Sequence, residues 1–278
     1  MIVVKTVPPE IDPTLQKLET SLNYVQSSLE SGMGSLKKRI SIFLQHAQKA
    51  GEKAIEPVLD FFSQLSVSQK ESFMSVLPFL WSKPDSPALR KLISLAIQDK
   101  SNSVREGAAE MVFGLKMKND YNLAAQTILD VAFDAQEYPV TDGNWTISYN
   151  AVLITDLPML FAQRIGNKET PLDYRLYIAN TMIDSMSECP DIREQAIYFV
   201  KNENLPYKVR HELVGGFSRT RDLDALATLK RARIKDPELA EAIASELRKQ
   251  MAIKKMDTAK TERTGSAVPS PKRVVAKN

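Results

Sequence analysis

Apolar residues recur every three or four positions along most of this chain, which is the spacing of helices with one buried face. The first stripe consists of Leu15, Leu18, Leu22, Val25 and Leu29. Asp12 and Pro13 precede it, and both residue types are favoured at the start of a helix. The stripe also fits two coiled-coil heptads, but a stable coiled coil usually needs three or four. We therefore expect a helical hairpin.

A second stripe follows over Leu36, Ile40, Phe43, Leu44 and Ala47. The same spacing predicts further helices over Glu56–Leu65, Ser68–Leu80, Pro87–Asp99, Ser103–Lys116, Tyr121–Ala135, Trp145–Ile165, Pro171–Glu188, Asp191–Asn202, Pro206–Ser218, Asp222–Ile234 and Pro237–Met256. Several begin at a proline, where the missing N–H costs nothing. Tyr138–Asn144 is the one longer loop predicted, with Asp142-Gly143 as its turn.

Composition supports an all-α fold. Glycine accounts for only 10 of 278 residues and aromatic residues for 7%, which argues against β-sandwiches and barrels. The longest apolar run, Ala196–Val200, is too short to cross a bilayer, so membrane insertion is not expected. The single cysteine, Cys189, excludes an internal disulfide and fits a reducing compartment. We expect a soluble, cytoplasmic protein and leave the nucleus open.

One segment resembles a HEAT repeat. Leu89, Leu92 and Leu95 line one predicted helix, Asp99 follows at the turn, and Val104-Arg105 opens the next helix. In the HEAT family the Asp and the Arg are implied to form a hydrogen-bonded ladder between repeats, and Asp99 and Arg105 match those positions. Weaker matches place Arg193 and Arg210 at the arginine position. They are only 17 residues apart, so both cannot hold the same role.

The resemblance implies an α-solenoid of antiparallel helix pairs. We expect an extended segment over 1–11, helical hairpins over 12–80, a HEAT-like array over 81–256 and a disordered basic tail over 257–278. The tail is rich in Thr, Ser, Pro and Lys, which cannot bury enough apolar surface to offset chain entropy.

Candidate chemistry is sparse, so we expect no catalytic, cofactor-binding or metal-binding residue. His46 and His211 have no second ligand at metal spacing, and no nucleophile elbow accompanies Cys189. Gly215-Gly216 lies inside a predicted helix rather than in a phosphate loop, and close helix packing explains it better. DNA glycosylases built from HEAT-like helices need aromatic residues in a basic groove. Here the tryptophans are only two, and Trp145 lies in an acidic segment.

Charge is distributed unevenly along the chain. Residues 1–119 carry 15 basic and 12 acidic side chains, residues 120–200 carry 4 and 12, and residues 201–278 carry 18 and 10. The middle is therefore acidic and the end basic, which suits partners of either sign and also head-to-tail self-association.

The basic end supplies the candidate macromolecule-binding residues. They are Arg219, Arg221, Lys230, Arg231, Arg233, Lys235, Lys254, Lys255, Lys272 and Arg273. The leading hypothesis is a non-catalytic scaffold or adaptor that binds another protein through an extended helical surface. The alternative is a nucleic-acid-associated protein that uses residues 210–278 to neutralise phosphates.

Overall fold

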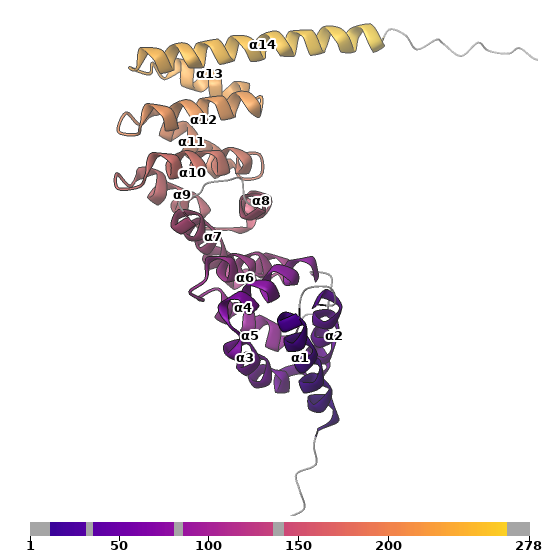
Figure 1. Cartoon of the computed structure of the whole chain (residues 1–278). Helices are drawn as coiled ribbons and strands as arrows, with labels where there is room; N and C mark the ends of the chain where they lie inside the picture. The colour runs from indigo at the N-terminus through magenta and orange to yellow at the C-terminus, as the bar shows by residue number, and fades with distance from the viewer. Residues whose placement is uncertain (1–11, 32–35, 81–85, 136–141, 266–278) are drawn as a thin grey trace, which may run out of the picture. The chain divides into compact units, whose positions relative to one another are not determined.

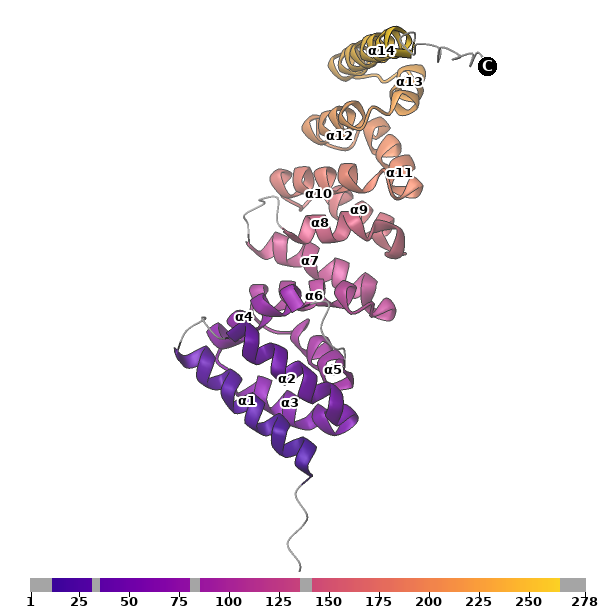
Figure 2. The same ribbon diagram turned by 90° about the vertical axis from the view of Figure 1, so that its right-hand side faces the viewer.

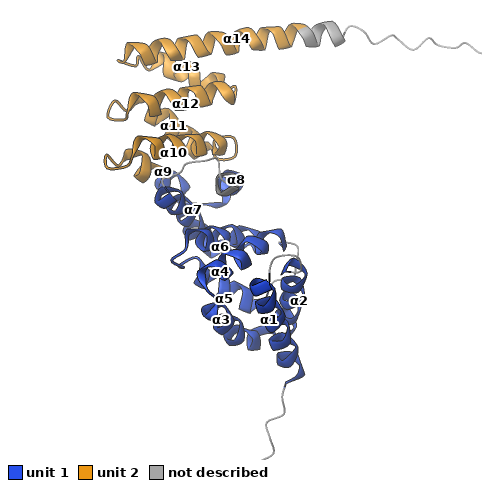
Figure 3. Cartoon of the chain, viewed as in Figure 1, with its two compact units in different colours: residues 1–160 blue, residues 161–278 orange. Residues whose placement is uncertain are grey.

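The computed structural model describes residues 12–31, 36–80, 86–135 and 142–265, with side chains omitted at 142–145 and 260–265. All regular structure within these ranges is helical, which confirms the predicted all-α class. The chain divides into two compact units, residues 1–160 and 161–278 (Figure 3). The division expected near residue 80 falls inside the first unit.

The first unit contains eight labelled α-helices joined by short connections and 3-10 turns (Figure 1). They are α1 (Pro13–Ser31), α2 (Leu36–Ala50), α3 (Ile55–Gln64), α4 (Val67–Val76), α5 (Pro87–Ala96), α6 (Asn102–Gly114), α7 (Tyr121–Ala135) and α8 (Asp142–Tyr149). Helix α9 (Leu157–Gly166) spans the division. The second unit contains α10 (Leu172–Ser185), α11 (Pro190–Lys201), α12 (Tyr207–Arg219), α13 (Leu223–Arg231) and α14 (Pro237–Gly265).

The core of the first unit forms where the predicted stripes meet. α1 packs against α2 as a hairpin, and α2 buries every residue of its expected stripe. The Phe73 ring of α4 lies 6.1 Å from Phe43 on α2 and 6.2 Å from both Phe61 and Phe62 on α3. Aromatic rings at such distances bury a large apolar area and add a favourable edge contact. Phe73 therefore joins three helices that are consecutive in sequence.

The helix predicted over Trp145–Ile165 is wrong, because this stretch forms α8, a 3-10 turn over Ala151–Leu153, and α9. Pro158 explains the break: a continuous helix would lose a hydrogen bond there and clash with the preceding turn. In the structure Pro158 instead occupies the first turn of α9. The turn predicted at Asp142-Gly143 is also wrong, since both residues begin α8. Residues 138–141 of that predicted loop lie outside the described ranges.

In the second unit the helices form two layers (Figure 2). α12 contacts both α10 and α14 in one layer, and α11 contacts α13 in the other. Each helix also packs against the next one in sequence, from α10 to α14. Within the first of these layers, α10 and α12 pack closely at Gly216 of α12, where an added Cβ would meet the Ile183 side chain of α10. Close packing is therefore the role of Gly216, whereas Gly215 has ordinary space around it.

Helix α14 ends at Gly265 rather than at Met256, so the segment predicted to be disordered does not begin at residue 257. Helix continues here because residues 257–262 include Ala, Lys and Glu, which have good helix propensity. Residues 266–278, with Lys272 and Arg273, lie outside the described ranges. No helix of the described chain combines the length and apolar character needed to cross a bilayer.

Candidate functional site

The four residues expected in a HEAT ladder take part in separate contacts. Asp99 accepts a hydrogen bond from Lys70 at 2.8 Å, and Arg105 donates to Asp134 at 2.6 Å. Arg193 forms two hydrogen bonds with Asp222, at 2.6 and 3.0 Å. Each of these three pairs joins residues 29 positions apart in sequence. The HEAT assignment itself stays a prediction.

A lysine or an arginine recurs at the same position, counted from the first residue, in several of the described helices. Lys70, Arg105, Arg193 and Arg210 are each the fourth residue of their helices, α4, α6, α11 and α12. Arg90 of α5 and Arg175 of α10 occupy the same position. Lys70, Arg90 and Arg175 were not singled out from the sequence. The predicted helix starts put them at the third, fourth and fifth positions of their helices, so the shared position emerges only from the observed starts.

Three of these arginines bind backbone carbonyls at the end of a neighbouring helix or in the connection that follows it. Arg90 donates to the Leu115 carbonyl at 2.9 Å, and Arg210 donates to the Val200 carbonyl at 2.9 Å. Arg175 donates to the carbonyls of Asn167 and Thr170. The last carbonyls of a helix have no partner within it, so a cation there satisfies them and complements the helix dipole. These residues therefore hold connections in place rather than a ligand.

The carboxylates in these pairs are stabilised in their ionised form. Burial raises the pKa of Asp222, but hydrogen bonds from Arg193 and from the Ala225 N–H lower the pKa by more than burial raises it. The pKa of Asp222 therefore lies below its usual value. The pKa of Asp99 is lowered in the same way, because Lys70 and the Ser101 N–H outweigh burial. Asp222 also caps α13, and so one side chain serves both a helix start and an ion pair.

The contacts of Arg210 and Arg193 define two opposite edges of the second unit. Arg210 contacts the end of α11 and Asp236 before α14, so we call this the Arg210 edge. Arg193 contacts Asp222 at the start of α13, and we call this the Arg193 edge. Helices α11 and α13 therefore begin at the Arg193 edge, and α12 and α14 begin at the Arg210 edge.

The structure divides the predicted basic cluster between these edges. Lys230, Arg231, Arg233 and Lys235 lie at the Arg210 edge, at the end of α13 and in the connection to α14. Arg219, Arg221, Lys254 and Lys255 lie at the Arg193 edge. The eight candidate residues that the structure describes do not form one continuous site.

Several of these cations already have partners. Arg219 pairs with Glu212 at 2.9 Å, Arg221 with Asp257 at 3.3 Å, and Lys235 with Glu203 at 3.3 Å. No ion pair within the described ranges involves Lys254 or Lys255. These two lysines are therefore available to an external anionic group.

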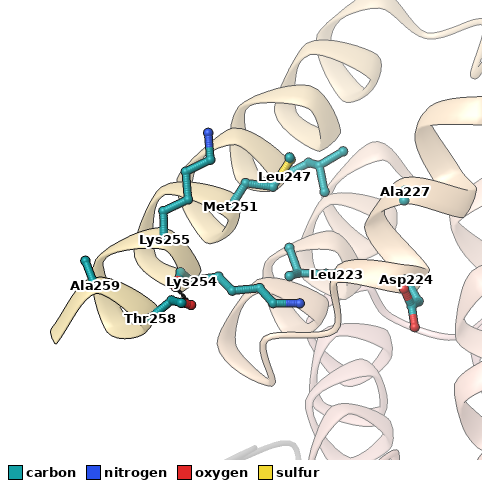
Figure 4. Close-up of a pocket in the computed structure, with 9 residues that line it drawn as sticks. All are labelled: Leu223, Asp224, Ala227, Leu247, Met251, Lys254, Lys255, Thr258 and Ala259. Carbon is teal, nitrogen blue, oxygen red and sulfur yellow. Dashed lines mark hydrogen bonds between the residues drawn. The ribbon is translucent and has the colours of Figure 1, made fainter. Parts of the chain in front are cut away.

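A groove with a volume of about 600 Å³ runs between α13 and α14 next to these two lysines (Figure 4). Leu223 and Ala227 line it from α13, while Leu247 and Met251 line it from α14. Met251 is 50% exposed, whereas Leu247, one turn earlier, is 8% exposed. In Figure 4 Lys254 extends from α14 toward α13. The groove thus offers an apolar floor with a cationic rim.

The length of α14 explains why this groove is open. α13 has 9 residues and α14 has 29, so α14 continues well past the shorter helix that packs against it. On its other side α14 is held by α12, through Ser218 to Glu246 at 2.6 Å and Gln250 to Ser218 at 2.9 Å. Leu223, Leu247 and Met251 were not predicted as site residues, because their shared site depends on how α13 and α14 pack.

The residues considered for chemistry do not come together. Within the described part of the chain, no group of three His, Cys, Asp or Glu side chains could hold a metal ion. Cys189 is a half-buried residue at the start of α11. Trp81 and the side chain of Trp145 lie outside what the structure describes. The α13–α14 groove is therefore the candidate functional site of the described chain.

Comparisons with protein-family models, with curated proteins and with solved structures find no match to this chain.

Proposed function

We propose that this chain is a HEAT-like α-solenoid that acts as a non-catalytic scaffold and binds another protein. The two-layered arrangement of α10–α14 supports this proposal, because stacked helices leave long flanks free for a partner. The fourth-position cations support it too, since they use their charge to hold connections.

The observation that carries the proposal is the α13–α14 groove. An exposed methionine above a buried leucine, beside two unpaired lysines, is typical of a surface that buries apolar area against a partner. Methionine suits such a surface because its flexible side chain adapts to different contacts.

The test is purification of the tagged full-length chain from its native cells after nuclease treatment, followed by native mass spectrometry. We expect a protein partner at a fixed ratio that survives nuclease. A chain that is recovered alone, or only with nucleic acid, contradicts the scaffold proposal.

A nucleic-acid-binding function is the second candidate, favoured by Lys230, Arg231 and Arg233 at the Arg210 edge. No carboxylate pairs with these three side chains in the described chain. Binding to duplex and single-stranded DNA and RNA across a salt series tests it. In a plot of the logarithm of the binding constant against the logarithm of the salt concentration, five phosphate contacts give a slope of about −4. A scaffold that does not contact phosphates gives a slope near zero.

A further inference from the structure

We infer that the α13–α14 groove binds an amphipathic helix of a partner protein whose apolar stripe is flanked by acidic side chains. This inference rests on the proposed scaffold function and names the chemistry of its partner. It follows from the shape, the apolar lining and the charge of the groove.

The shape favours a helix. The groove lies between two packed helices and becomes open where α14 continues past α13. A third helix laid beside α14 would occupy the place that a longer α13 would have filled. Helix-in-groove docking of this kind uses apolar anchors at positions i, i+3 or i+4, and i+7.

The residues of α14 that line the groove recur at the same helical spacing as the anchors of such a partner helix. Leu247 and Met251 are one turn apart, Lys254 and Lys255 follow in the next turn, and Thr258 and Ala259 in the turn after that. The partner-facing side of α14 is thus apolar at first, then cationic, then small. From Leu247 to Ala259 this face extends roughly 18 Å, the length of a partner helix of about 12 residues.

The charge of the groove selects an acidic partner. Its lining contains two lysines and one carboxylate, Asp224. The lysines have no ion-pair partner within the described chain, so acidic side chains can approach them without displacing an existing contact. Residues 266–278 of this chain contain three cationic and no acidic side chains, so charge disfavours them as occupants.

The experiment uses the full chain and three labelled 14-residue synthetic peptides in fluorescence anisotropy. The first has a helical leucine stripe flanked by glutamates, the second has lysines in place of the glutamates, and the third has serines in place of the leucines. We expect the first peptide to bind at least about tenfold more tightly than either of the others at 50 mM NaCl. We also expect its affinity to fall with added salt, as charge screening increases.

Variants locate the binding in the groove. Met251→Glu should weaken binding of the acidic peptide by about tenfold or more. The double variant Lys254→Glu, Lys255→Glu should bind the basic peptide more tightly than the acidic one. Met159→Glu is the matched control, because Met159 is 52% exposed but lies on α9, outside the groove. Circular dichroism checks that all variants keep their helix content.

Three outcomes overturn the inference. The first is equal binding of the acidic and basic peptides, and the second is unchanged binding of the acidic peptide to the Met251→Glu variant. The third is a dimer of the wild-type chain that Met251→Glu dissociates, which would make a second copy the occupant. A native partner that still co-purifies with the Met251→Glu variant would leave the scaffold proposal intact and refute only the groove assignment.

Discussion

Two adjacent glycines of α12 offer a matched test of how closely α10 and α12 pack. A Cβ at Gly216 would lie 3.0 Å or less from three side-chain atoms of Ile183, whereas at Gly215 the nearest atom is Arg219 Nη1 at 3.8 Å. Ile183 is only 3% exposed. Both of its γ carbons are among the close atoms, so rotation of the side chain would not open the space.

The magnitudes follow from two opposing effects. Replacing glycine by alanine inside a helix stabilises it by about 1 kcal/mol. Overpacking a core costs about 1–3 kcal/mol. We therefore expect Gly215→Ala to stabilise the protein and Gly216→Ala to be less stable than Gly215→Ala by about 2 kcal/mol, a value near the middle of the overpacking range.

Urea unfolding followed by circular dichroism measures this difference. With a slope near 2 kcal/mol per M, the two midpoints should differ by about 1 M. Hydrogen exchange of α10 and α12 amides checks that the change is local. Adding Gly216→Ala to an Ile183→Ala background should be stabilising, because the crowding atoms are gone. Equal midpoints for Gly215→Ala and Gly216→Ala would refute the close-packing argument.

Three further predictions concern charge and backbone strain. Because the pKa of Asp222 is lowered on folding, its ion pair with Arg193 stabilises the protein above about pH 4 and is lost as pH falls through the folded pKa. Asp222→Asn, which keeps a capping residue, should flatten the fall in urea midpoint below pH 5. Lys116 has a φ of 54°, so Lys116→Gly should raise the free energy of unfolding by about 1 kcal/mol, and a lower urea midpoint would contradict this. The hydrogen bond from Lys53 lowers the pKa of Asp12 to about 2, and NMR titration should show a return toward its ordinary value in Lys53→Met.

Much of the helical architecture was predictable because a buried face needs a local repeat of three or four residues. The α2 stripe and the proline starts of α5 and α14 follow from neighbouring residues alone. The break between α8 and α9 was predictable in principle from Pro158, but the apolar periodicity on both sides concealed it. The helical extension to Gly265 was missed because a threonine-rich composition was given more weight than helix propensity.

The candidate site was not predictable to the same degree. Ten basic residues between 219 and 273 were predicted as candidate macromolecule-binding residues. Of the eight that the structure describes, α13 separates four from four others at the opposite edge. The α13–α14 groove combines residues that lie up to 36 positions apart, such as Leu223 and Ala259. Helical periodicity determines which face of each helix is apolar, because it is a property of one segment. Which faces remain uncovered depends on how neighbouring helices differ in length and pack, and only the tertiary structure decided that.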